Sequence, residues 1–410
     1  QTLAAANHWE SIIQNNHSMT VQFWYADLPD DRLADALPLV FTNSRTTVGR
    51  IRFDTRDEQG DLRNWWFDNT PSEDEEYEMD HVSYGINEPS SAFIGTPLDG
   101  LEIGYRGVTF DGPAAGKFDF QSTALHEFGH LLGVNNTVPA ADNENDDGDY
   151  DLPSSLMNGD VAAVRTAFGS QAHIRPGTAL MCNECASEGL RRRPSAVDIL
   201  AAASTSNWNN VDFPRKMLVD GTNFNAASNW LDSQAPSPSD DAFVTAEGTF
   251  SSPVELTAND SVGSLTVLGT YLSTGDHILN VNGRTWVERP ADAFVALRIP
   301  AGGVLNTDSL VLRSGSLAPG GGAVFVTGDM TIEDDGVGAL DSNLSGSGLV
   351  DVSGTLVNDG IIRTSGGGTL TLTSSTNTPL DLDGDSGNGE LEALNGDRVI
   401  EDALADPFDD

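Results

Sequence analysis

Short alternating apolar segments recur through the second half of the chain and constrain its fold more than any other feature. SLTVLG (264–269), SLVLRSG (309–315) and GLVDVSG (348–354) begin 45 and then 39 residues apart, with another such segment between each two. A repeat of about 20 residues is typical of β-solenoids, in which each coil buries its inward side chains against the next. The pattern therefore predicts an all-β region, either a parallel β-solenoid or, as the alternative, a β-sandwich built from hairpins.

Aromatic residues separate this region from the first part of the chain. Of the 30 Phe, Tyr and Trp residues, 23 lie before residue 233. In that part, apolar spacing predicts helices over 2–14, 30–41 and 120–133, and strands over 19–25, 47–55 and 101–110. Helices mixed with a few strands indicate an α+β domain. We therefore expect an α+β domain over 1–205, a polar, turn-rich junction over 206–229 and the all-β domain over 230–410.

The charge balance excludes several classes of partner. The chain has 62 Asp and Glu against 21 Lys and Arg, which gives a formal net charge of −41. Such a surface repels nucleic acid and anionic lipid. No stretch approaches the roughly 18 uninterrupted apolar residues that a membrane helix needs. We expect no nucleic-acid partner and no membrane insertion. Because the chain begins at Gln1 without a secretory signal pattern, we also expect a processed product.

Residues 126–133 read HEFGHLLG and carry the clearest chemical motif of the chain. His126 and His130 are four residues apart, so on a helix both imidazoles lie on one face and can reach one metal ion. Glu127 is adjacent, and a carboxylate there can accept a proton from water at an open zinc position. The motif therefore predicts a zinc-dependent hydrolase with His126 and His130 as ligands and Glu127 as the catalytic residue.

This segment resembles the extended motif of the metzincin family of zinc metalloproteases. Gly133 follows His130 by three residues, as in that motif, where the helix ends and the chain turns back. The common third ligand would fall at Asn136, which is a weak zinc ligand. In leishmanolysin-like metzincins and in a group of secreted bacterial metalloproteases, a long insertion precedes the third His. The resemblance therefore implies His173 as the third zinc ligand and Met181, eight residues later, as the Met-turn residue.

The resemblance covers roughly residues 5–205. WWFDNTPSEDEEYE is similar to an aromatic and acidic segment of the bacterial group, and RRRPSAVDILAAAS looks like the helix that follows the Met-turn. Met157, in SSLMNGD, is the alternative Met-turn residue. Met181 is preferred because a His precedes it at a short distance.

Cysteines and an asparagine follow Met181 directly. Cys182 and Cys185 are the two cysteines of the chain, so a second metal site built on them would need two further ligands. We expect a disulfide that braces the turn. Some metzincins have Tyr two residues after the Met, whereas this chain has Asn183, so oxyanion stabilisation would rest on zinc alone.

Two acidic segments are candidates for calcium binding. The first offers side chains at roughly calcium-loop spacing, although its twelfth position is Ser, and these are Asn143, Asn145, Asp147 and Asp151. The second matches loop positions 1, 3, 5 and 12 but lacks Gly at position 6, and its residues are Asp381, Asp383, Asp385 and Glu392. For both segments the alternative is a solvated acidic loop.

These features together predict a secreted or cell-surface zinc metalloendopeptidase, with zinc as cofactor and calcium as a second candidate. Its partner would be a protein or peptide substrate, which would add as an extended strand to the edge formed by residues 101–110. The C-terminal domain would take a surface or polysaccharide ligand. The alternative function is an adhesin with a degenerate protease domain, but a binding module has no need for the carboxylate of Glu127.

Overall fold

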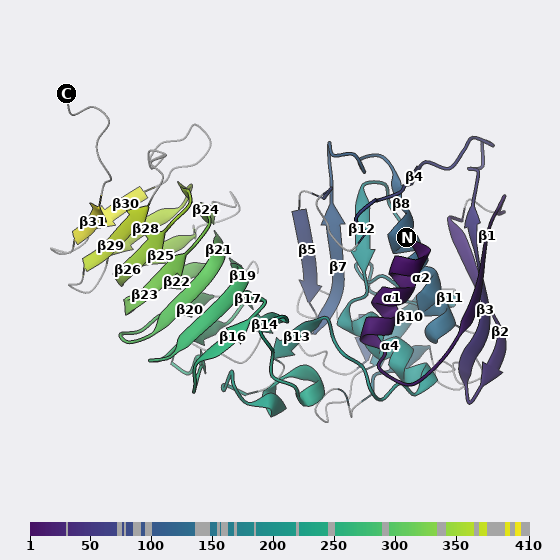
Figure 1. The fold of residues 1–410 in the computed structure, drawn as a ribbon, viewed down its shortest axis with the longest axis horizontal. Coiled ribbons are helices and arrows are strands. Elements are labelled where there is room, and N and C mark those ends of the chain that lie inside the picture. Colours follow the sequence, from purple (N-terminus) through teal and green to yellow (C-terminus); the bar gives the residue numbers. More distant parts are fainter. Residues whose placement is uncertain are drawn as a thin grey trace. The chain divides into compact units, whose positions relative to one another are not determined.

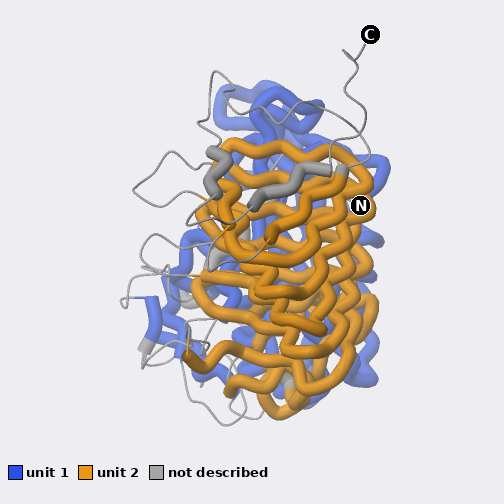
Figure 2. The backbone as a smooth tube through the Cα atoms, turned by 90° about the vertical axis from the view of Figure 1, so that its left-hand side faces the viewer, with its two compact units in different colours: residues 1–213 blue, residues 214–410 orange. Residues whose placement is uncertain are grey.

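The chain folds into two compact units, residues 1–213 and 214–410, in a computed structural model (Figure 2). The boundary lies within residues 206–229, for which the sequence predicts a junction. The structure describes residues 1–29, 32–71, 76–77, 79–84, 92–94, 101–135, 148–153, 156, 163–167, 170–183, 186–218, 221–244, 251–288, 295–333, 342–364, 369–374, 390–393 and 398–402. Over this part the chain is mostly β, with few helices and with large parallel sheets (Figure 1).

The first unit combines helices with short sheets. Its described α-helices are α1 (Thr2–Ile12), α2 (Phe120–Leu132) and α4 (Ala196–Ser206). Its strands are β1 (Thr20–Ala26), β2 (Ala34–Thr42), β3 (Arg45–Asp54), β4 (Trp65–Trp66), β5 (Met79–Tyr84), β6 (Phe93–Ile94), β7 (Glu102–Val108), β8 (Phe118–Asp119), β9 (Asp149–Asp151), β10 (Ala163–Ala167), β11 (Ser170–Ile174) and β12 (Leu190–Arg193). The helices predicted over 2–14 and 120–133 and the strands predicted over 19–25, 47–55 and 101–110 are confirmed.

The helix predicted over residues 30–41 is wrong, because its described part forms β2. This strand pairs antiparallel with β3 in the sheet β1-β3-β2. Asn43 and Ser44 join the two strands with φ values of 51° and 64°, and two positive φ values in a two-residue loop are typical of a type I′ hairpin turn. Pro38 is tolerated because β2 is an outer strand, where the missing N–H breaks no ladder. The register shifts beside it.

A second sheet corrects the expectation about residues 101–110. In the order β12-β7-β5, β7 is the middle strand, with antiparallel partners on both sides. Its N–H and C=O groups are therefore engaged, and an extended substrate cannot add to it. The remaining sheets of the unit are β11-β10-β6, with β9 on β10, and the pair β4-β8.

The second unit is built almost entirely from strands. It also has two 3-10 turns, η3 (Ala227–Asn229) and η4 (Leu231–Ser233). Its strands are β13 (Arg215–Leu218), β14 (Asp241–Val244), β15 (Val254–Glu255), β16 (Asp260–Val262), β17 (Ser264–Leu268), β18 (Tyr271–Ser273), β19 (Ile278–Glu288), β20 (Ala296–Arg298), β21 (Val304–Arg313), β22 (Ser316–Ala318), β23 (Gly320–Val326), β24 (Met330–Glu333), β25 (Asn343–Ser345), β26 (Ser347–Val352), β27 (Leu356–Asn358), β28 (Ile361–Thr364), β29 (Thr369–Ser374), β30 (Glu390–Ala393) and β31 (Arg398–Asp402).

These strands form two parallel sheets, and the chain alternates between them. The larger has twelve strands and the smaller has seven, in the order β15-β18-β20-β22-β25-β28-β30. Leu265 pairs with Thr285 and Thr285 with Leu310, so successive coils are 20 and then 25 residues long. Every strand pair described in this unit is parallel, whereas hairpins of a β-sandwich would pair antiparallel. The region is therefore all-β and solenoid-like.

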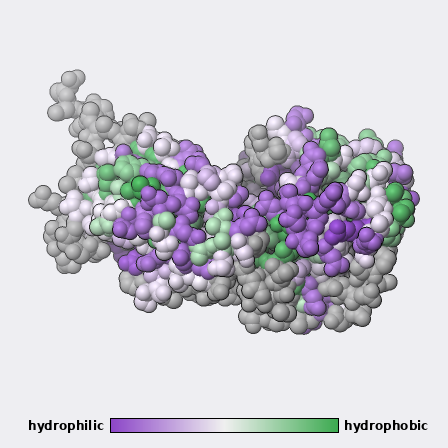
Figure 3. Space-filling model, turned by 60° about the horizontal axis from the view of Figure 1, so that its bottom comes forward, coloured by the Kyte–Doolittle hydropathy of each residue, from purple (hydrophilic) through white to green (hydrophobic). Residues whose placement is uncertain are grey.

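Inward aliphatic side chains fill the space between these two sheets. Leu265, Leu279, Leu305 and Val324 are fully buried, and all belong to one hydrophobic cluster. Burying them against neighbouring coils stabilises each coil by roughly 1.5–3 kcal/mol per side chain. Many outward positions are polar, although Ile278 and Val357 are exposed. Hydrophilic residues cover much of the described surface on the face drawn in Figure 3. None of the helices among the described residues is long and apolar enough to span a membrane.

Candidate metal centre

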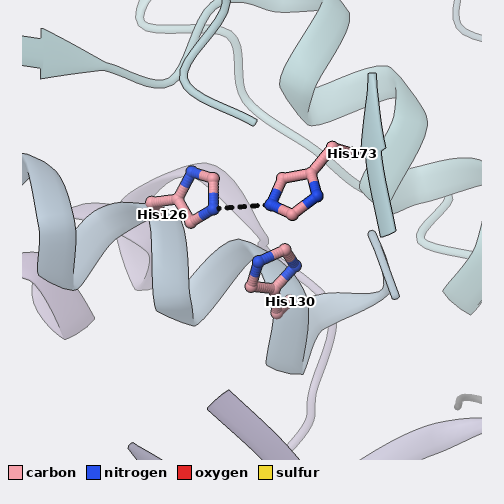
Figure 4. A group of neighbouring side chains, drawn as sticks. All are labelled: His126, His130 and His173. Carbon is pink, nitrogen blue, oxygen red and sulfur yellow. Dashed lines mark hydrogen bonds between the residues drawn. The ribbon is translucent and has the colours of Figure 1, made fainter. Parts of the chain in front are cut away.

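Three histidines from two elements converge in the first unit. His126 and His130 lie on α2, and His173 lies on β11. The nearest ring nitrogens of the three side chains are within 4.8 Å of one another, and the Nε2 atoms of His126 and His173 are 3.3 Å apart. Figure 4 shows the three rings facing a common point. The three side chains are therefore close enough together to bind one metal ion.

Helix α2 is fixed at both ends, which holds two of these histidines in place. Asp119 precedes the helix, and its carboxylate accepts the N–H of Ser122 at 2.6 Å. At the other end, Gly133 adopts a φ of 146°, a conformation that side chains disfavour. Ser206 Oγ and Trp208 Nε1 donate to the last helical carbonyl at 2.7 and 3.0 Å. A carbonyl that the helix itself leaves open is thus satisfied by the last residue of α4 and by a residue just after it.

Each histidine is also oriented through its other ring nitrogen. His126 Nδ1 donates to the carbonyl of Leu180 at 2.7 Å, and His130 Nδ1 donates to that of Val134 at 2.6 Å. His173 Nδ1 lies 2.7 Å from Ser170 Oγ. A carbonyl can only accept, so His126 and His130 carry their proton on Nδ1 and present the Nε2 lone pair to the centre. This tautomer is the one that metal ligation requires.

Burial keeps the three imidazoles neutral. It lowers the pKa of His126 to about 3, with the neighbouring His130 as the second cause. Burial and His173 lower the pKa of His130 to about 3, and burial and His126 do the same for the pKa of His173. Neutral imidazole is the ligating form, so at neutral pH no proton has to be displaced before a metal binds. Three neutral imidazoles whose ring nitrogens converge are complementary to a cation.

The carboxyl group of Glu127 is deeply buried, and one of its oxygens makes no hydrogen bond. Its side chain is 5% exposed, and Oε2 has no hydrogen-bond partner. Burial raises the pKa of Glu127 to about 8, with Asp35 as the second cause, while Arg32 acts in the opposite direction. A buried polar atom without a partner is uncommon and often marks a functional site. A carboxyl with this pKa is suited to exchange protons near neutral pH, and a bound cation nearby would lower the pKa.

Met181 packs against the helix of His126 and His130 and is hydrogen-bonded to the strand of His173. It is fully buried, and its sulfur packs so closely on Gly129 of α2 that a Cβ at that glycine would overlap it. The N–H of Ile174, the residue after His173, donates to the Met181 carbonyl at 3.0 Å. The turn at Met181 therefore contacts both elements that carry the histidines.

A buried carboxylate that the sequence did not reveal organises this turn. Asp198 of α4 accepts the N–H groups of Leu180 and Met181 at 3.1 and 2.8 Å. It also accepts the N–H and hydroxyl of Ser195 at 2.9 and 2.6 Å. Because the Leu180 carbonyl accepts from His126, Asp198 positions one of the three convergent histidines through a single peptide unit. Ser195 and Asp198 have the spacing of a capping box, which predicts only the start of a helix.

Asp198→Asn should loosen the turn and weaken metal binding. The amide keeps the size of the side chain but places donors against N–H groups, so we expect a loss of roughly 1–3 kcal/mol of unfolding free energy. Disturbing a ligand's support typically lowers metal affinity by about 10–100-fold. Thermal unfolding and competition with a zinc-selective dye measure the two effects.

Asp57→Asn is the matched control for this variant. Asp57 also accepts two backbone N–H groups, from Gln59 and Asp61 at 3.0 and 2.8 Å, but it lies in an exposed loop of the same unit. Its replacement should leave metal affinity unchanged. Equal effects of the two substitutions would contradict the positioning role of Asp198.

Several residues singled out in the sequence lie outside the described residues, so their structural roles remain expectations. These are Asn136, Met157, Cys185, Asn143, Asn145, Asp147, Asp381, Asp383 and Asp385. Asp151 ends β9 and is exposed, and Glu392 belongs to β30, although its side chain is not described. Cys182 is buried and disulfide-bonded, in line with a brace for the turn.

The candidate metal centre therefore has three convergent imidazoles, a buried carboxyl at the residue after His126 and a methionine packed against α2. Its ligands come from residues 47 positions apart, which only the fold brings together. No protein-family model, no curated protein and no solved structure matches this chain.

Proposed function

We propose that the chain is a zinc-dependent metalloendopeptidase of the metzincin type. One observation carries this proposal: three imidazoles with their Nδ1 atoms engaged face one point, and the residue after His126 is a buried Glu127 whose Oε2 has no partner. A site that only stored a metal would have no use for that open carboxylate oxygen. The combination is suited to hydrolysis with a metal and a general base.

Zinc fits this donor set better than other common metals. Imidazole is a borderline-soft donor that suits zinc, whereas calcium and magnesium prefer oxygen ligands. Three protein ligands are the usual number in catalytic zinc sites, since they leave a position for water or substrate. When bound there, zinc would polarise the scissile carbonyl and acidify water.

The residues of the chain supply the proton transfers and the geometry. Glu127 would take the proton of the attacking water and return it to the leaving amine, which its raised pKa supports. His126, His130 and His173 would fix the metal, and their anchored Nδ1 atoms would keep the three rings from turning. This rigidity counts in catalysis because small misplacements of reacting groups are costly.

Strand β2 is a candidate edge for an extended substrate. It is an outer strand of its sheet in the described residues, and α2 packs against β2 and β3. Asp35 of β2 is near enough to Glu127 to raise its pKa. A peptide that paired with β2 would therefore lie close to the metal centre, and main-chain pairing would tolerate many side chains.

Secretion is the location that fits this function. Cys182 forms a disulfide, and such bonds persist in oxidising compartments and are rare in the cytosol. The charge of −41 also keeps a protein soluble in salty media, where screening reduces self-repulsion.

Metal removal tests the proposed function directly. We expect about one zinc per chain by elemental analysis, and digestion of casein that a chelator stops and added zinc restores. Glu188→Gln, an exposed substitution in the same unit, should behave like the parent protein. Proteolysis that persists without metal would contradict the proposal, as would a metal-loaded protein that cleaves no peptide.

A further inference from the structure

Two arginines lie directly opposite each other on neighbouring strands of the first unit. Arg106 of β7 pairs with Arg192 of β12 in the antiparallel register. Side chains at such positions share one face of the sheet, with Cβ atoms roughly 4.5–5.5 Å apart. Like charges directly opposite destabilise a sheet, and here they occur in a chain with 62 acidic and only 21 basic residues.

No carboxylate is hydrogen-bonded to either guanidinium in the part of the chain that the structure describes. Arg192 Nη1 donates to the carbonyls of Gly177, Thr178 and Ala179 at 3.1, 2.7 and 3.2 Å, and its Nε is buried without a partner. Arg106 Nε is likewise buried and unpartnered. Asp198 is near enough to influence Arg192, but Leu180, Met181 and Ser195 already engage its oxygens.

The side chain of Thr178 provides a third polar group that lacks a hydrogen-bond partner. Thr178 Oγ1 is buried without a partner, and its own carbonyl accepts from Arg192. Arg192 is 8% exposed and therefore more than nine-tenths buried. Burial and the charge of Arg106 lower the pKa of Arg192 to about 10, which reflects the cost of this arrangement. The two unpartnered Nε–H groups and the unpartnered hydroxyl are complementary to an oxygen-rich anion, which would accept from all of them.

We propose that Arg106, Arg192 and Thr178 form a binding site for an oxyanion of the carboxylate or sulfate class. The ligand is either a small free anion or the carboxylate of an acidic side chain in a peptide substrate; the second source rests on the proposed function. The site adjoins the support of the metal centre. Arg192 binds the carbonyl of Ala179, and the next carbonyl, that of Leu180, accepts from His126.

Anion-dependent thermal stability of the full chain tests the site without any need for catalysis. Millimolar sulfate, at ionic strength held constant with sodium chloride, should raise the melting temperature of the parent protein in a saturable manner. Arg106→Gln should weaken this response about tenfold or more, because it removes a charged donor. In sulfate-free buffer the same variant should be at least as stable as the parent, since the repulsion is gone.

Two further variants keep this result interpretable. Arg50→Gln is the matched control: its guanidinium lies over the Trp24 ring at 5.3 Å and its Nε is also unpartnered, but no arginine opposes it. It should respond to sulfate like the parent, because general salting effects act on all variants alike. Arg106→Lys keeps the charge and should retain part of the response. If sulfate does not raise the melting temperature of the parent, or raises it equally in the parent and in Arg106→Gln, the proposed site is wrong.

Paired peptides identify the source of the anion. If the ligand is a substrate carboxylate, a peptide with Glu should have a lower KM than the same peptide with Gln, and Arg106→Gln should abolish that difference. If the peptides are cleaved alike while sulfate binding is lost in Arg106→Gln, the site takes a free anion. An inactive protein that still shows the sulfate response would contradict the proposed function and leave the site intact.

Discussion

Glu127→Gln is expected to leave the metal bound and to abolish most of the peptide hydrolysis. Glutamine fills the same volume but cannot accept the proton of the attacking water, so kcat should fall by about 10²–10⁴-fold or more. KM should change little, because Glu127 is not among the three side chains that converge on the metal position. Zinc content by elemental analysis and initial rates on a fluorogenic peptide measure the two quantities.

The sign of the stability change separates this variant from a damaged protein. Burial raises the pKa of Glu127 to about 8, so its charged form is disfavoured in the folded apo protein. The neutral amide should therefore leave the apo protein as stable as the parent above pH 8 or slightly more so. Glu127→Asp, which keeps a carboxylate but withdraws it, should retain partial activity. Parent-like turnover by Glu127→Gln would exclude Glu127 as the base.

Local sequence patterns predicted the helices and strands whose formation depends on residues close together in the sequence. HEFGHLLG predicted both the helix and the common face of His126 and His130, because a spacing of four residues fixes that face. The alternating segments predicted the strands of the second unit, while the choice between solenoid and sandwich required the pairing direction. Gly133 likewise predicted the end of α2.

The parts that were missed depend on partners far apart in the sequence. Strand β2 has an apolar spacing that also suits a helix, and its pairing with β3 through Asn43 and Ser44 decided the outcome. The role of Asp198 arises from N–H groups 17 and 18 residues away, and the opposition of Arg106 to Arg192 arises from strand register. No local pattern carries that information, since it comes into being only when the strands pair.

His173→Ala should strip most of the metal from the protein, and with it the activity. His173 supplies one of the three ring nitrogens that lie within 4.8 Å of one another. Its loss would leave two imidazoles, too few protein ligands for a stable zinc site. Supporting groups outside the ligand set already contribute about 10–100-fold in affinity, so loss of a ligand should cost more than about 100-fold. Competition with a zinc-selective dye measures the affinity.

Two matched variants test whether this effect belongs to the ligand position. Asn136→Ala removes the residue at the common metzincin position and should leave the metal bound, because an amide is a poor zinc ligand compared with imidazole. His17→Ala removes a histidine whose Nε2 lies 2.6 Å from the Thr46 carbonyl, away from the other three, and should also leave it bound. The reverse pattern, with metal lost from Asn136→Ala and kept by His173→Ala, would favour Met157 as the Met-turn residue. The resemblance to long-insertion metzincins would then fail, because it depends on a third ligand that arrives after a separation of 43 residues from His130.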